Sequence, residues 1–317
     1  MQNKSFLFTF AFSMLPLGAP AALLVDVNLE NGYITNASIA GQSGTGDPGL
    51  SGTWAVISNT NYDVTVKTGG LTYAAADGSY TINGGSNSLE VKQTLAPGYG
   101  GTGSSLTNIS LSAPVTGKNV FVGTLLKRSG NNTLATSFAL GFFASDASTE
   151  NVFGPGLGLA GSAISSQKPI LLAGDNSTNF AQFESSTRSP GVLWSDVDSD
   201  ATFFMVAEYI WSEADKAYTS VKFWLNPAQD GNTTGALFYA AYDLKNNFTS
   251  ISCIGLSVAN WQAGNAFTFD AFRIGENWED LVPQSSVPEP GVAALYLGLA
   301  TLFAVALRRA GVHGAKA

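Results

Sequence analysis

The sequence predicts an all-β fold, a β-sandwich or jelly roll, for the long central part of the chain. Short runs rich in Val, Ile, Phe and Tyr recur along it, and turn-forming residues, many of the 35 glycines among them, separate these runs. No sustained 3.6-residue apolar periodicity appears before residue 291, so long helices are not expected there. Nine runs have the composition of strands: 61–68, 78–84, 118–126, 136–143, 201–211, 219–226, 235–244, 249–258 and 265–275.

Two glycine-rich segments, 94–104 and 154–161, are predicted to be loops. The second contains Gly156-x-Gly158-x-x-Gly161, which formally matches a dinucleotide-binding fingerprint. That fingerprint requires a strand before it and a helix after it, so that the phosphate meets a helix N-terminus. The residues that follow, SAISSQKPI, contain a proline and no helical face, so we interpret the segment as a loop without a cofactor.

The runs 201–211 and 219–226 are predicted to form a hairpin whose register can be read from the side chains. With the turn centred on Asp215, Glu208 lies opposite Lys222, and this cross-strand ion pair favours the register. The face that carries this pair also carries Trp224, which suggests a wet surface that faces a ligand. Glu208, Lys222 and Trp224 are therefore candidate ligand-binding residues. The other face is predicted to be core and pairs Met205 with Leu225, Ala207 with Phe223 and Tyr209 with Val221.

The N-terminal residues 1–22 have the layout of a secretory signal peptide. Lys4 precedes an apolar run from Phe6 to Leu17, and Ala19 and Ala21 follow in an A-x-A arrangement. The apolar run is too short to span a bilayer comfortably, which favours a cleaved signal over an anchor. Cleavage is expected after residue 21 or 22, which leaves a β-sandwich domain over 23–283 outside the cytoplasm.

The C-terminal part divides into a linker (284–290), an apolar segment (291–307) and a basic tail (308–317). The apolar segment has 17 uncharged residues and would reach about 25 Å as a helix, close to the thickness of a hydrocarbon core. Pro290 suits the first helical position. Arg308 and Arg309 follow at once, so the positive-inside rule places this tail in the cytoplasm. The segment is predicted to be a transmembrane helix; a short core helix is the alternative.

Between the two ends the chain is acidic and has no histidine. Of 23 acidic and 15 basic residues, only Glu289 and four bases lie in the ends, which leaves a net charge of about −11. This charge argues against nucleic acid as a partner. The only histidine, His313, lies in the basic tail, which excludes Ser-His-Asp chemistry and histidine zinc sites from the domain. The only cysteine, Cys253, is expected to be a buried strand residue.

Asp196, Asp198 and Asp200 alternate in the segment SDVDSDATF and are the candidate metal ligands. Three carboxylates in one loop suit Ca²⁺, which prefers hard oxygen ligands. The spacing is not that of an EF-hand, because Ala201 and Ala207 stand where glycine and glutamate are needed. A solvated acidic loop without metal is the alternative, and no cofactor other than Ca²⁺ is suggested.

Glycoside hydrolysis needs two carboxylates held across a sugar. The hydrolases with this architecture have a strand with the pattern E-x-D-x-x-E. Neither Glu208 nor the pair Glu213 and Asp215 completes it, because Tyr218 stands in the last position. No catalytic residues are therefore assigned.

The end of the chain resembles the PEP-CTERM sorting signal of exported bacterial proteins. The likeness rests on Val287-Pro288-Glu289-Pro290, the apolar segment and Arg308-Arg309, which occur in the order typical of that signal. The resemblance implies that an exosortase-type enzyme cuts near the Pro-Glu-Pro motif and passes the protein to the cell surface or an extracellular matrix. The processing partners would be signal peptidase and this exosortase, with the inner membrane as a transient anchor.

The segments SIAGQSGTGDPGLSGTWAV, VKFWLNP and FTFDAFRIGENWEDLVP resemble laminin-G/concanavalin-A-like jelly-roll proteins. This resemblance spans most of 23–283 and implies the fold, which hosts lectins, adhesion modules and glycoside hydrolases alike.

The sequence therefore suggests a non-enzymatic surface or matrix protein with a structural or adhesive role, and extracellular polysaccharide or Ca²⁺ as its ligands. The alternatives are an extracellular glycoside hydrolase that uses carboxylates alone, and a permanently anchored membrane protein.

Overall fold

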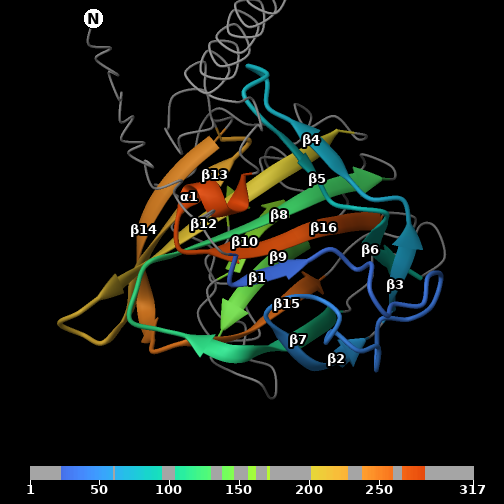
Figure 1. Ribbon diagram of the computed structural model, residues 1–317, viewed down its shortest axis with the longest axis horizontal. Coiled ribbons are helices and arrows are strands. Elements are labelled where there is room, and N and C mark those ends of the chain that lie inside the picture. Colours follow the sequence, from blue (N-terminus) through green and yellow to red (C-terminus); the bar gives the residue numbers. More distant parts are fainter. Residues whose placement is uncertain are drawn as a thin grey trace, which may run out of the picture. The chain divides into compact units, whose positions relative to one another are not determined.

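The computed structural model describes residues 23–59, 61–94, 104–129, 138–145, 156–161, 170–171, 201–227, 238–259 and 266–282. Nearly all of the regular structure in these residues is β-strand, and α1 (Trp278–Leu281) is a single helical turn (Figure 1). The chain divides into two compact units, Met1–Pro283 and Gln284–Ala317. The predicted signal peptide and the predicted linker, transmembrane helix and basic tail lie outside the described residues. No helix in the described ranges has the length and apolar character needed to cross a membrane.

Among the described residues, the larger sheet has eight strands, all paired antiparallel. Seven of these strands follow one another in a linear order that has β3 at one edge, and β1 pairs with β16 outside that order. In spatial order the strands are β14 (Phe238–Phe248), β13 (Ala217–Leu225), β12 (Thr202–Ser212), β8 (Val120–Ser129), β16 (Ala266–Gly275), β6 (Asn87–Gln93) and β3 (Tyr62–Thr68), with β1 (Val25–Val27) off this path.

A second sheet has six strands and is also antiparallel. In order these are β11 (Ile170–Leu171), β10 (Gly156–Gly161), β9 (Phe138–Ser145), β15 (Ile251–Ala259), β7 (Ser104–Val115) and β2 (Leu50–Asn59). A separate two-stranded hairpin, β4 (Thr72–Ala74) and β5 (Thr81–Asn83), completes the described strands.

The main core lies between the two large sheets. One continuous cluster of buried side chains takes Val64, Val122 and Phe269 from the larger sheet and Ile109 and Leu256 from the smaller one. Strand β3 shows how the sequence produces this arrangement, because its buried and exposed residues alternate along the strand. The predicted all-β sandwich is therefore confirmed, and Cys253 is fully buried on β15 as expected.

The loop after β1 closes one side of the sandwich. Its backbone pairs with the edge strand β3, through the N–H groups of Asn36 and Ile39, and with the edge strand β2, through the N–H of Gly41. The side chain of Gln42 holds the loop by accepting from the N–H of Ile34 at 2.7 Å. Edge strands covered in this way cannot pair with another chain, which protects a glycine-rich sandwich against aggregation.

The outer face of the larger sheet carries a second apolar cluster. The β4–β5 hairpin and α1 lie over this face and contribute most of the cluster (Figure 1). The strands below supply Leu125, Phe204, Val206 and Trp224. Where the hairpin and α1 cover it, the larger sheet is therefore buried on both faces, which explains why β12 and β13 contain few polar residues.

The predicted hairpin register is confirmed between β12 and β13. Glu208 pairs with Lys222, and Met205 pairs with Leu225, as the side-chain pattern indicated. A bulge between Ile210 and Trp211 shifts the register by one residue, so the last ladder pair is Ser212 with Ala217.

The prediction of a loop at 154–161 is wrong. It was expected to be a loop, but Gly156–Gly161 forms strand β10, which pairs with both β9 and β11. Glycines weaken a strand because they lose the most backbone freedom and bring no side chain to pack. Here the neighbouring strands supply the pairing that the local sequence does not indicate. The other predicted loop, 94–104, lies almost wholly outside the described residues.

Candidate functional site

The predicted ligand-binding residues lie together on the outer face of β12 and β13. Lys222 Nζ donates to Glu208 Oε2 at 2.8 Å, and the Glu208 side chain is only 12% exposed. The predicted ion pair is therefore present and partly buried.

Trp224 corrects the expectation that this face is wet. It is 5% exposed and packs edge-to-face on Trp278 of α1, with ring centroids 5.7 Å apart. Phe121 also packs edge-to-face with Trp278, with ring centroids 6.0 Å apart. A sugar could stack on the Trp224 indole only if α1 moved away. Ligand binding by Glu208, Lys222 and Trp224 stays a prediction.

Substitution of Lys222 with methionine should lower the free energy of unfolding by about 1 kcal/mol, because Glu208 would be left partly buried without its cation. Chemical denaturation measures this change. Lys216→Met is the matched control, because the Lys216–Glu213 pair is more than 70% exposed on both sides and should contribute nothing measurable. Equal effects of the two substitutions would contradict the account.

The predicted Ca²⁺ ligands Asp196, Asp198 and Asp200 lie outside the described residues. Within the described ranges, no group of three or more His, Cys, Asp or Glu side chains is placed to hold a metal ion. Ca²⁺ binding by these three aspartates stays a prediction.

The sequence did not indicate the most unusual polar group in the structure, Asp270 on β16. Its side chain is fully buried. Oδ2 accepts from the backbone N–H of Leu71 at 2.7 Å, and Oδ1 accepts from the N–H of Ala271 at 2.7 Å. Burial raises the pKa of this carboxyl to about 8, which the two N–H donors and Arg273 only partly offset. The raised pKa favours the protonated form of Asp270 at neutral pH.

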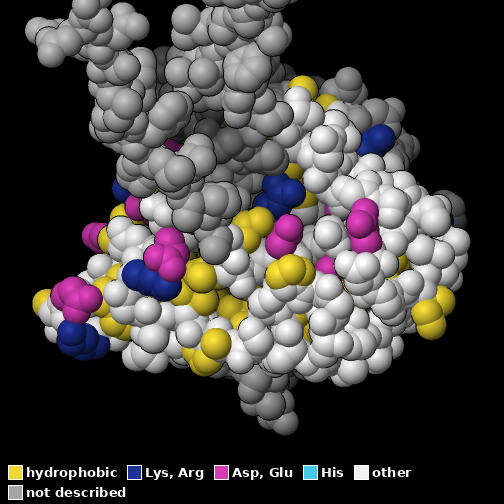
Figure 2. Space-filling model, in the orientation of Figure 1, with side chains coloured by type: hydrophobic (Ala, Val, Ile, Leu, Met, Phe, Trp, Pro, Cys, Tyr) yellow, Lys and Arg dark blue, Asp and Glu magenta, His cyan; other side chains and the backbone are white. Residues whose placement is uncertain are grey.

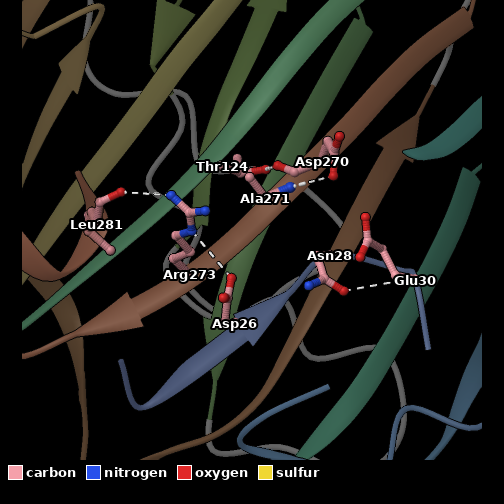
Figure 3. A network of polar contacts seen from close by, with 8 residues as sticks. All are labelled: Asp26, Asn28, Glu30, Thr124, Asp270, Ala271, Arg273 and Leu281. Carbon is pink, nitrogen blue, oxygen red and sulfur yellow. Dashed lines mark hydrogen bonds and ion pairs between the residues drawn. The ribbon is translucent and has the colours of Figure 1, made fainter. Parts of the chain in front are cut away.

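The backbone around Asp270 is distorted. Ala271 has a φ of 50°, a conformation that costs free energy for any residue with a Cβ, and a bulge separates Asp270 from Arg273 in the pairing with β8. Thr124 Oγ1 donates to the Asp270 carbonyl at 3.0 Å within this bulge (Figure 3). The Asp270 side chain lies at the start of the β4–β5 hairpin, where it accepts from Leu71, and strain of this kind is often found at functional positions.

A second polar network lies beside the first, on β1 and α1. Arg273 Nε donates to Asp26 Oδ1 at 3.2 Å, and Arg273 Nη1 donates to the Leu281 carbonyl at 3.1 Å (Figure 3). One guanidinium thus ties the first described strand to the last helical turn. Its position indicates a structural role, because both of its partners are parts of the fold.

Asp47 is another of the buried carboxylates among the described residues. Tyr33 Oη donates to Asp47 Oδ2 at 2.8 Å, and Trp54 Nε1 donates to Tyr33 Oη at 3.0 Å. Burial raises the pKa of Asp47, and the hydrogen bond from Tyr33 opposes the shift. This chain of hydrogen bonds joins the loop after β1 to β2. It fixes the loop that covers the sheet edges.

Comparison with known proteins adds a likeness in fold. No protein-family model and no curated protein matches the chain. An endo-β-1,4-glucuronan lyase from the fungus Trichoderma reesei is 15% identical, with a TM-score of 0.39 over 73% of this chain and 94% of that one. A carbohydrate esterase from the Shiga toxin-encoding bacteriophage phi24B is 9% identical, with a TM-score of 0.42 over 81% and 99%. A legume lectin-like domain from Entamoeba histolytica is 11% identical, with a TM-score of 0.35 over 68% and 90%. At these TM-scores the likeness carries no inference about a ligand or a reaction.

Figure 2 shows a face on which the charged side chains are scattered, with acidic and basic groups adjoining in several places. The buried carboxylates among the described residues accept hydrogen bonds from the backbone, as Asp270 and Asp280 do, or from a tyrosine hydroxyl, as Asp47 does. One signal in the sequence could have drawn attention to Asp270: it is a carboxylate in the middle of the apolar strand AFTFDAFRIG. A charged residue at such a place is rarely buried without a specific partner.

Proposed function

We propose that the chain is an exported, non-enzymatic surface or matrix protein with a structural or adhesive role. The signal peptide 1–22 would deliver it across the membrane, and the segment 291–307 would anchor it until processing. The observation that carries the proposal is the order of three features at the C-terminus: Val287-Pro288-Glu289-Pro290, 17 uncharged residues, then Arg308-Arg309. An exosortase-type enzyme that recognises this tail is the expected partner.

The sandwich suits an existence outside the cytoplasm. Its core draws on both sheets and uses no disulfide, so its folding does not depend on the redox state of the compartment. The loop held by Asp47, Tyr33 and Gln42 covers two sheet edges, which favours a soluble domain at high local concentration.

The non-enzymatic part of the proposal is supported by the state of Glu208. This residue was the strand carboxylate considered for sugar hydrolysis. It is paired with Lys222, and Trp224 on the same face is covered by Trp278 of α1. Release of reducing sugars from a polysaccharide by the purified protein, abolished by one Glu→Gln change, would overturn this part and establish the hydrolase alternative. Binding to insoluble polysaccharide without turnover would make the role adhesive.

Substitution of Pro288, Glu289 and Pro290 with alanine should keep the protein at full length in the membrane fraction. The enzyme that cuts the wild type would lose its recognition motif, while the apolar segment would still anchor the chain. Immunoblotting of membrane and extracellular fractions measures the distribution. Gln284→Ala, in the same linker but outside the motif, should be processed like the wild type. Release of the triple variant in wild-type amounts would contradict the sorting proposal.

A further inference from the structure

The neck of the β4–β5 hairpin is built around the Asp270 side chain. Leu71, at the start of the hairpin, donates its N–H to Asp270 Oδ2 at 2.7 Å. Gly84, at the end of the hairpin, lies so close that a Cβ added to it would be 2.0 Å from the same oxygen. Gly84 in turn donates its N–H to the Leu71 carbonyl at 2.9 Å. Both ends of the hairpin therefore meet at one buried carboxyl.

The hairpin is a cover and not part of either large sheet. Its strands pair only with each other in the described residues. The side of the hairpin that faces the larger sheet buries Leu71, Tyr73, Tyr80 and Ile82. Tyr73 and Tyr80 both pack on Phe204 of β12. Away from the neck, Tyr80 Oη donates to the Pro227 carbonyl at 2.6 Å. If the neck opened, an aromatic surface would be exposed.

Two charged groups act on Asp270 among the described residues. Arg273 lies further along β16 and favours the ionised form, and Glu30 lies after β1 and disfavours it. Glu30 is itself fixed at the neck, because its Oε1 accepts from the N–H of Ser86 at 2.8 Å. The neck residues Gly70, Leu71, Gly84 and Gly85 carry no charge, and neither do Thr124 and Leu125 of β8. The ionised carboxylate thus has no full counter-charge beside it.

We propose that ionisation of Asp270 releases the β4–β5 hairpin from the outer face of the larger sheet, so that the hairpin is a pH-sensitive cover over an aromatic surface. In the closed state the neutral carboxyl fits among the neck glycines and holds Leu71. When the carboxyl loses its proton, the charge gains water only if the neck opens. This inference does not depend on the proposed export of the protein.

The direction of the effect follows from the two protonation equilibria. In the closed state the pKa of Asp270 is raised from its ordinary 3.8 to about 8, mainly by burial, while in the open state the hydrated carboxyl has its ordinary pKa. The closed state therefore binds the proton more strongly. Its advantage is full at acid pH, declines as the pH rises between these two pKa values, and levels off above about 8. The decline is up to about tenfold in the opening equilibrium per pH unit.

Hydrogen exchange of the purified protein tests this proposal. After correction for intrinsic exchange rates, the protection factors of the Leu71, Ala75 and Gly84 amides should fall by up to about tenfold per unit between pH 5 and 7.5. The amides that pair β7 with β15, in the other large sheet, should keep constant protection. Protection of the hairpin amides that does not change with pH would overturn the proposal.

Two variants assign the pH dependence to this group. Asp270→Asn removes the titration, so the protection of the hairpin amides should no longer vary with pH; an unchanged slope would contradict the proposal. Glu30→Gln keeps the oxygen that accepts from Ser86 but removes the charge that raises the pKa of Asp270. The midpoint of the pH-dependent change in hairpin protection should therefore move to lower pH. Should Asp270→Asn fail to fold, a carbon-13 titration of the wild-type Asp270 carboxyl decides the matter. A midpoint near 4 would overturn the inference, and one well above 6 would support it.

Discussion

Replacement of Phe269 with alanine is expected to lower the free energy of unfolding by about 3–5 kcal/mol. Phe269 is 1% exposed, lies on β16 at the centre of the main core, and stacks on Phe272 with ring centroids 6.1 Å apart. The substitution removes a whole ring from between the two sheets, and the surrounding strands cannot collapse to fill the space. Equilibrium denaturation of the purified domain measures the loss.

Two comparisons make this result specific to the core. Phe269→Leu keeps most of the volume and should cost about 1–2 kcal/mol. Ile34→Ala, at a side chain that is 68% exposed, should stay within about 0.5 kcal/mol of the wild type. A loss below about 1 kcal/mol for Phe269→Ala would mean that the two sheets do not pack as described.

Substitution of Gly84 with alanine should have the second large effect, a loss of about 3 kcal/mol. The new Cβ would lie 2.0 Å from Asp270 Oδ2 and 2.2 Å from its Cγ. Asp270 is fully buried and holds Leu71, so it cannot move aside without loss of that hydrogen bond. Thermal or chemical denaturation checks the stability, and exchange of the Leu71 amide shows whether the hairpin neck is the part that opens.

Gly78→Ala is the matched control in the same hairpin. Gly78 has a φ of 72° at the hairpin turn, and a Cβ added there would meet no atom within 4 Å. Only the backbone strain remains, so the cost should be about 1 kcal/mol. If Gly84→Ala were no worse than Gly78→Ala, Asp270 would not occupy the neck.

Most of the sandwich could be predicted because its strands are marked by their own residues. All nine predicted runs overlap a strand of the structure, namely β3, β5, β8, β9 and β12 to β16, whereas no run was predicted for β1, β2, β4, β6, β7, β10 or β11. The pairing of β12 with β13 was predictable from Met205 to Ile210, since Glu208 and Lys222 fix the register and a slip by one would turn the core residues outward; the bulge beyond Ile210 was not. In these cases local composition and tertiary pairing agree.

The parts that could not be predicted depend on contacts between distant segments. Strand β10 is rich in glycine and exists because β9 and β11 lie beside it. Trp224 was expected to be exposed because the residues that cover it, Trp278 above all, come much later in the chain. No pattern within β13 indicates which of its faces a helical turn will cover.

In the candidate site, too, some contacts could be predicted from the sequence and others could not. The ion pair between Glu208 and Lys222 follows from strand register and was found from the sequence. The position of Asp270 at the hairpin neck depends on Leu71 and Gly84, which approach it from far away in the chain. The raised pKa of its carboxyl comes mainly from burial, and burial is a property of the complete fold.

The intact mass of the protein recovered from cells, measured separately in the membrane and extracellular fractions, tests the central claim most directly. The account predicts an extracellular product that begins at residue 22 or 23 and ends near Val287, without the apolar segment and without Arg308 and Arg309. A full-length C-terminus found only in the membrane fraction would contradict it and would make this chain a permanently anchored surface protein.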